Sequence, residues 1–161
     1  MRNDVRIEIL ENNLVGRHAE SVAILQSHIA TGDLVATVML ARMGEAAGLS
    51  QDAVDEMIAH VESVMDPRDP AVHLELSKAY DQRLGNLPYE EKALRSFSHL
   101  VSAAELGGGA TCSLAVARIY LTGAIGVVAD ESQALRWYRR AVDEGSEEAL
   151  QELRAVRNGS A

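Results

Sequence analysis

The sequence predicts an all-α fold, a superhelix (solenoid) of about three to four stacked helical hairpins. Two observations lead to this prediction. Apolar residues recur at helical spacing along nearly the whole chain of 161 residues, and Gly, Pro and Asp stand where these stretches begin or end. In addition, one local pattern returns three times at intervals of about 40 residues, which is typical of helical repeat proteins. We expect residues 1–161 to form a single repeat domain.

The first element expected is an N-terminal helical segment over residues 4–31. Its start is ambiguous, because Val5, Ile7 and Ile9 alternate as in a strand, whereas Ile7 and Leu10 fit one face of a helix. A single strand would have no partner in an otherwise helical chain, and isolated strands are unstable. We therefore expect a helix here.

Three repeats of two helices each are expected next, over about 33–66, 69–107 and 110–145. In the first repeat, Asp33 and Ser50 precede the two apolar stripes and are suited to cap helix N-termini.

The later helices have equally clear signals at their ends. Pro70 and Pro88 are suited to helix starts, where the missing N–H would be unpaired in any case. The glycine run 107–109 disfavours helix continuation and separates two repeats. Asp130 opens the last long helix, and a capping helix is expected over 146–156.

The three repeats share one motif in the first helix of each pair. Its copies are Leu40-Ala41-Arg42-Met43, Leu76-Ser77-Lys78-Ala79 and Val116-Ala117-Arg118-Ile119. A single hairpin cannot bury its own apolar stripe, so neighbouring hairpins stack and share a core. The small residues Ala41, Ser77 and Ala117 are expected where the two helices of a hairpin cross.

The segment 119–145 reads IYLTGAIGVVADESQALRWYRRAVDEG and resembles the Sel-one-like repeat (SLR), a branch of the tetratricopeptide-repeat superfamily. The matching positions are Ala117, Tyr120, Gly123, Gly126, Val127, Asp130, Ala134, Trp137, Tyr138, Ala141 and Gly145. The segment departs from the pattern by one extra residue between the loop glycines and by Gln133 in place of a basic residue. The resemblance weakens toward Met1 and covers about two thirds of the chain. It implies a right-handed superhelix whose concave surface holds protein or peptide ligands.

Composition excludes several classes of partner. The chain has 15 Lys and Arg against 24 Asp and Glu, a formal charge of −9. Nucleic acids and anionic membrane surfaces are recognised by cationic footprints, so we expect neither as a partner. The first twenty residues contain no uninterrupted apolar stretch typical of a secretory signal, and the single Cys112 cannot form an internal disulfide. These features favour a cytoplasmic location.

The residue types that carry catalysis form no recognisable motif. Five histidines lack the spacing of a zinc site, and they are His18, His28, His60, His73 and His99. Cys112 follows the glycine run at a helix start, where the helix dipole lowers a thiol pKa, but a small buried residue is the favoured interpretation. The glycine run could hold an anion, although a linker between repeats fits better. We expect no catalytic residue, metal or cofactor.

The resemblance supplies a candidate binding surface, because the residue after each small crossing residue points into the groove in that family. Here these residues are Arg42, Lys78 and Arg118, which we call the basic ladder. A ladder of this kind suits an acidic peptide or a C-terminal carboxylate. The same register adds the other candidate groove residues, namely Val38, Leu74, Leu114, Glu45, Asp81, Gln82, Leu121 and Thr122.

A second interpretation of the basic ladder stays open. Arg42 and Glu45, and Lys78 and Asp81, are spaced for ion pairs within one helix, whereas Arg118 has no acid at that spacing. The sequence therefore predicts a non-catalytic adaptor or regulator that binds a protein segment in its groove. The alternative function is a structural one, in which exposed end repeats stack on another copy to form a homo-oligomer.

Overall fold

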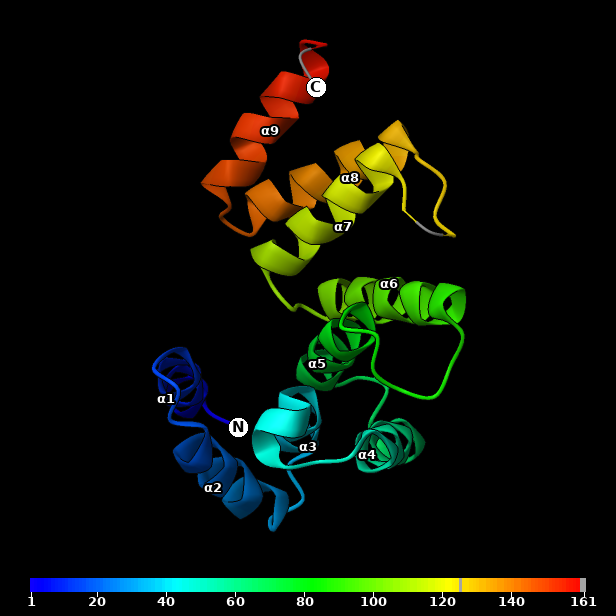
Figure 1. Ribbon diagram of the computed structural model, residues 1–161. Coiled ribbons are helices and arrows are strands. Elements are labelled where there is room, and N and C mark those ends of the chain that lie inside the picture. The colour runs from blue at the N-terminus through cyan, green and yellow to red at the C-terminus, as the bar shows by residue number, and fades with distance from the viewer. Residues whose placement is uncertain (125, 160–161) are drawn as a thin grey trace.

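The computed structural model describes residues 1–124 and 126–159, and within them it has nine α-helices, one 3₁₀ helix and no strand (Figure 1). The helices are α1 (Asn3–Leu14), α2 (His18–Ile29), α3 (Leu34–Met43), η1 (Gly44–Ala47), α4 (Gln51–Val64), α5 (Pro70–Asp81), α6 (Tyr89–Glu105), α7 (Ala110–Thr122), α8 (Glu131–Asp143) and α9 (Glu147–Arg157). The predicted all-α solenoid is confirmed. No helix in this part of the protein is both long and apolar enough to cross a membrane.

The ambiguous N-terminal segment forms a helix, α1, as expected. Its inner side is held by Ile9, which is 1% exposed, and the Ser21 hydroxyl on α2 donates a hydrogen bond to the Ile9 carbonyl at 3.2 Å. Packing against α2 therefore favours the helical spacing of this segment over its strand-like alternation.

Capping residues occupy the helix starts, and they include the expected Asp33, Ser50 and Asp130. The side chains of five residues accept hydrogen bonds from backbone N–H groups of the first turn, which would otherwise be unpaired. These residues are Asp33, Ser50, Asp69, Asp130 and Ser146.

The small residues of the repeated motif lie inside, where a larger side chain would separate the helices. Ala41 and Ala117 are fully buried, and Ser77 is 5% exposed. In the hairpin of α5 and α6, the Ser96 hydroxyl donates to the Ser77 carbonyl at 2.9 Å, which shows how closely the two backbones approach.

The hairpins do not stack in a uniform way. Helix α3 packs against α2, α4 and α5, whereas α7 packs against α6 and its own partner α8. Figure 1 shows the result, with α1–α6 forming the lower part of the molecule and α7–α9 the upper part. The contact between the two parts includes an edge-to-face pair of Phe97 and Tyr120, whose ring centroids are 5.3 Å apart.

The glycine run forms the linker between α6 and α7. Gly107 and Gly109 both have φ of +89°, a conformation that favours glycine. A Cβ atom on Gly108 would lie 2.7 Å from the Ala103 carbonyl oxygen, so this position also excludes a side chain. The backbone N–H of Gly108 donates to that same carbonyl at 2.8 Å, which ends α6.

We predict that Ala117→Leu lowers the free energy of unfolding by about 1–3 kcal/mol, because the added atoms have no space between α7 and α8. Urea denaturation followed by circular dichroism measures this. The matched control is Ala19→Leu on α2, where the side chain is exposed. Equal stability of the two variants would disprove the close crossing at Ala117.

Candidate partner-binding site

One buried carboxylate connects three helices near the middle of the molecule. Glu75 on α5 is 1% exposed, and three cations surround it. Arg42 Nη1 on α3 lies 2.6 Å from Glu75 Oε2, Lys78 Nζ lies 2.8 Å from Oε1, and Arg6 Nη2 on α1 also donates to Oε1. A buried charge is stable only when it is paired in this way, so the Glu75 cluster, meaning Glu75 with Arg6, Arg42 and Lys78, fixes α1, α3 and α5 together.

The Glu75 cluster has more positive than negative charge. Three cations and one carboxylate carry a formal charge of +2 in a protein whose total is −9. Arg42 also donates from Nε to the Gln82 amide oxygen at 3.0 Å, so its guanidinium plane is fixed. The cations are partly open to solvent, with exposed side-chain fractions of 22% for Arg6, 24% for Arg42 and 41% for Lys78.

The structure separates the basic ladder into two parts. Arg42 and Lys78 meet at Glu75, whereas Arg118 contacts α9. The predicted ion pairs of Arg42 with Glu45 and of Lys78 with Asp81 were wrong. Both cations pair with the buried Glu75 instead. Burial makes the pairing with Glu75 stronger than a pairing with exposed acids.

Arg118 is bound by two carboxylates of α9. Its guanidinium donates from Nη2 to Glu148 at 2.6 Å and from Nε to Glu152 at 3.1 Å. The Tyr138 hydroxyl also donates to Glu152, at 2.9 Å. Arg118 holds the pKa of Glu152 below its usual value, and burial together with the Glu152 carboxylate raises the pKa of Tyr138 to about 12. Sequence spacing within α7 could not show these partners, because they belong to a helix 30 residues further along the sequence.

Two of the other predicted groove residues are not at the surface. Val38 is fully buried and Leu114 is 4% exposed, so the prediction that they face a ligand was wrong. Both are needed in the core, Val38 in the one that extends from α1 to α5 and Leu114 in the one of α7–α9. The remaining residues are half-buried, as for Leu74 and Leu121, or exposed, as for Glu45, Asp81, Gln82 and Thr122.

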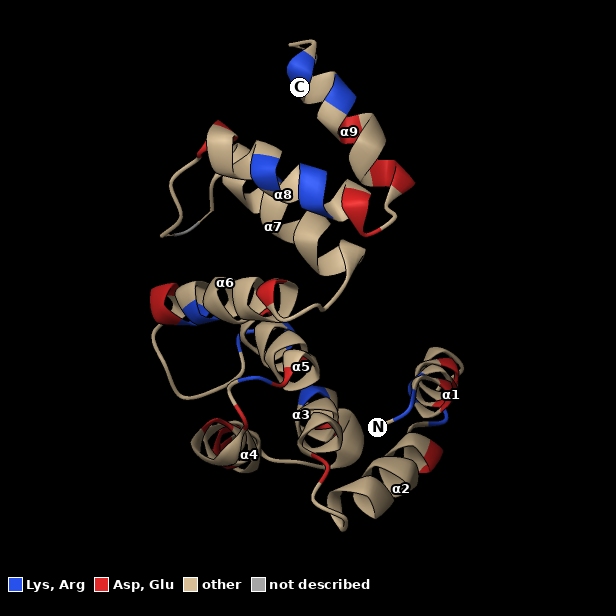
Figure 2. Cartoon of the chain, turned by 180° about the vertical axis from the view of Figure 1, so that it is seen from behind, with Lys and Arg blue, Asp and Glu red and all other residues tan. Residues whose placement is uncertain are grey.

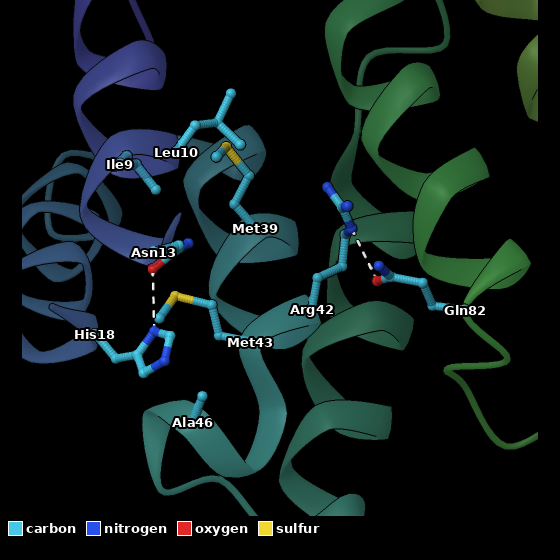
Figure 3. Close-up of a pocket in the computed structure, with 9 residues that line it drawn as sticks. All are labelled: Ile9, Leu10, Asn13, His18, Met39, Arg42, Met43, Ala46 and Gln82. Atoms are coloured by element: carbon cyan, nitrogen blue, oxygen red, sulfur yellow. Dashed lines mark hydrogen bonds between the residues drawn. The ribbon is translucent and has the colours of Figure 1, made fainter. Parts of the chain in front are cut away.

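A cavity of about 320 Å³ opens beside the Glu75 cluster (Figure 3). Arg42 and Gln82 form one wall, and the other lining residues are Ile9, Leu10, Asn13, His18, Met39, Met43 and Ala46. Figure 3 shows the thioethers of Met39 and Met43 on the side of the cavity nearest α1. Such side chains adapt readily to different apolar ligands.

A second cavity, of about 460 Å³, lies between α5, α6 and α7. Its walls are mostly apolar and include Leu74, Leu100 and Ala115, with Lys78 also in the lining. This space exists because α7 packs against α6. It does not pack along α5 in the way that α5 packs along α3. Lys78 therefore belongs both to the Glu75 cluster and to this cavity.

A polar network that was not predicted from the sequence joins α4, α5 and α6. His73 and His99 contact each other through their Nδ1 atoms at 2.8 Å, and His99 Nε2 lies 3.4 Å from Glu62 Oε1. Arg95 donates to both oxygens of Glu62, at 2.9 and 2.8 Å. Hydrogen bonds from His99, Tyr80 and Arg95 hold the pKa of Glu62 at about 2 despite its partial burial. The network holds three helices together behind the Glu75 cluster.

Cys112 has the character of a packing residue. It is 2% exposed, its Sγ lies 3.4 Å from the Gly108 carbonyl oxygen, and burial raises the pKa of its thiol. The favoured interpretation of Cys112 is thus supported over a reactive thiol. Among the residues that the structure describes, no group of three or more His, Cys, Asp or Glu is arranged to hold a metal ion.

Comparison with known proteins identifies the fold. No protein-family model matches the sequence, and neither does any curated protein. A protective antigen of uropathogenic Escherichia coli that displays an SLR fold superposes with a TM-score of 0.60, at 20% identity over 92% of this protein. A Sel1 repeat protein from Oxalobacter formigenes superposes with a TM-score of 0.58, at 16% identity over 91% of this protein. The 161 residues span 33% and 58% of those two proteins.

We predict that Glu62 stabilises the fold above pH 4.5, its ordinary pKa, and that this contribution is lost as the pH falls toward 2. At neutral pH, Glu62→Gln should lower the free energy of unfolding by on the order of 2 kcal/mol, and the difference from wild type should shrink below pH 4.5. Chemical denaturation across this pH range measures the effect. The control is Glu56→Gln, an exposed residue of the same helix. A difference that is independent of pH would show that Glu62 is not held ionised by its neighbours.

Proposed function

We propose that this protein, which has the fold of the Sel1 repeat (SLR) proteins, is a non-catalytic interaction module that acts as an adaptor or regulator. In this proposal a peptide or protein segment binds in a concave groove along α3, α5 and α7. The observation that carries the proposal is the positive surplus of the Glu75 cluster, whose cations are partly exposed between two cavities.

The surplus favours a ligand that brings a carboxylate. Glu75 neutralises one of the three cations, so a second carboxylate, from an acidic residue or the C-terminus of a peptide, would be attracted to the open sides of Arg42 and Lys78. Hydrogen bonds between charged groups are about twice as strong as neutral ones. Arg118 already binds two carboxylates, and we therefore assign the ligand contact to the other two members of the basic ladder.

The two cavities favour apolar side chains next to that carboxylate. The cavity lined by Met39 and Met43 also includes Arg42, and the cavity lined by Leu74 and Leu100 also includes Lys78. A peptide with a carboxylate and flanking apolar residues would match both. Such sites combine mostly apolar walls with a few fixed polar groups.

Non-catalytic binding fits the chemistry of this surface. Arg42 and Arg118 are engaged in ion pairs that join helices, Arg42 with Glu75 and Arg118 with Glu152. We also propose a reducing, cytoplasmic setting, in which the buried Cys112 remains a free thiol.

We predict that short peptides with an apolar C-terminal residue and a free carboxylate bind at the Glu75 cluster, and that the same peptides with an amidated C-terminus bind at least about tenfold more weakly. Titration calorimetry measures the affinities, and NMR shift changes at Arg42 and Gln82 locate the site. Lys78→Met should weaken binding of the free-acid peptides while Arg6 and Arg42 keep Glu75 paired.

Lys92→Met is the matched control, since the Lys92 side chain on α6 bonds to the Arg83 carbonyl and lies outside the cluster. This variant should bind as wild type does. Free-acid and amidated peptides of equal affinity, or shift changes confined to α4 and α6, would refute the proposed site.

A further inference from the structure

The helices α1 and α9 differ in the surface they present. The last helix, α9, buries Ala149 and Leu153, and its opposite side carries the exposed polar residues Glu147, Gln151 and Arg154. The outer face of α1 differs, because it exposes large apolar side chains.

The outer face of α1 is an apolar stripe. Ile7, Leu10 and Leu14 are spaced by three and four residues, so they lie along one side of the helix. Their exposed fractions are 55%, 57% and 85%, and Val15, just past the end of α1, is 65% exposed. Four large apolar side chains are thus exposed within nine residues. Exposed apolar side chains that gather on one surface are typical of interaction sites.

Acidic residues form a second row beside the α1 stripe. Asp4, Glu8 and Glu11 are exposed and are spaced by four and three residues. Figure 2 shows acidic segments on the side of α1 that is turned away from α3. Arg2 pairs with Asp4 at 3.6 Å, which leaves Glu8 and Glu11 as the acids that give this flank its charge.

The inner side of α1 is fixed, so the stripe is presented on a preformed helix. Ile9 is buried, and Arg6 is bound to the Glu75 cluster. Leu10 belongs both to the stripe and to the lining of the 320 Å³ cavity, so the stripe continues into a hollow. A preformed surface loses little conformational freedom when a partner docks.

We propose that the α1 stripe docks an amphipathic helix of another protein, whose apolar side packs on Ile7, Leu10 and Leu14 and whose Lys or Arg residues face Glu8 and Glu11. An apolar helix face laid on a complementary surface is a common mode of recognition, and the charges set the orientation. This inference does not depend on the function proposed for the Glu75 cluster, and Leu10 is the one residue of the stripe that also lines the cavity beside that cluster.

A second copy of this protein fits the stripe poorly. If two α1 helices packed antiparallel about a twofold axis, the row of Asp4, Glu8 and Glu11 would face the same row of the other copy, and like charges oppose such contacts. In a parallel pair, the acidic row of one α1 would face the other flank of the second α1. Arg6 belongs to that flank, but it is already paired with Glu75 and offers the acids no free cation. The polar outer side of α9 offers no apolar match either.

The test uses two synthetic amphipathic helical peptides with the same apolar stripe, one flanked by Lys and the other by Glu. We expect the Lys-flanked peptide to bind at least about tenfold more tightly than the Glu-flanked one at low salt. Ile7→Ser combined with Leu14→Ser should reduce its binding by a similar factor, and Glu8→Gln combined with Glu11→Gln should remove the preference for Lys.

Val64→Ser is the matched control, because Val64 on α4 is 53% exposed and lies elsewhere on the molecule. It should bind as wild type does, and so should Lys78→Met, which separates this surface from the proposed groove. Binding that is unaffected by the Ile7 and Leu14 substitutions overturns the proposal. So does sedimentation showing a dimer of the free protein that those substitutions dissociate, because the occupant would then be a second copy.

Discussion

The buried carboxylate of Glu75 is the interaction on which the arrangement of the N-terminal half depends. It receives cations from α1, α3 and α5, and these helices lie far apart in sequence. Most contacts in a repeat protein are between neighbours along the sequence. The Glu75 cluster is different, since Arg6 reaches a residue 69 positions away. It thereby sets where α1 lies relative to α5, and with it the walls of the cavity beside Arg42.

The fold could be predicted from the sequence because its determinants are local. Capping residues such as Asp33, crossing residues such as Ala117 and the glycine run at 107–109 each act within one hairpin or one linker, and the structure contains all three features. The stacking of α7 on α6 instead of α5 could not be predicted in this way. It depends on how side chains such as Phe97 and Tyr120 fit together across two hairpins.

The candidate site was predicted only in part. The repeat register identified Arg42, Lys78 and Arg118 as a related set, but it could not identify their partners. Glu75 is one of 24 acidic residues, and spacing does not show which of these is buried. The pairing of Arg118 with α9 could not be predicted for the same reason, because it depends on how α9 packs against α7 in three dimensions. Sequence periodicity thus indicated the positions, while the three-dimensional fold determined whether each charge remains available to a ligand.

Hydrogen exchange of the backbone amides in Glu75→Gln tests the central role of this carboxylate most directly. The variant leaves three partly exposed cations without their shared anion, and removal of one partner from such a cluster is destabilising. We predict that amides of α1 and α3 lose protection first, while those of α7–α9, which have their own core, keep the protection of the wild type. Unchanged protection of α1, or an equal loss throughout the molecule, would contradict the account.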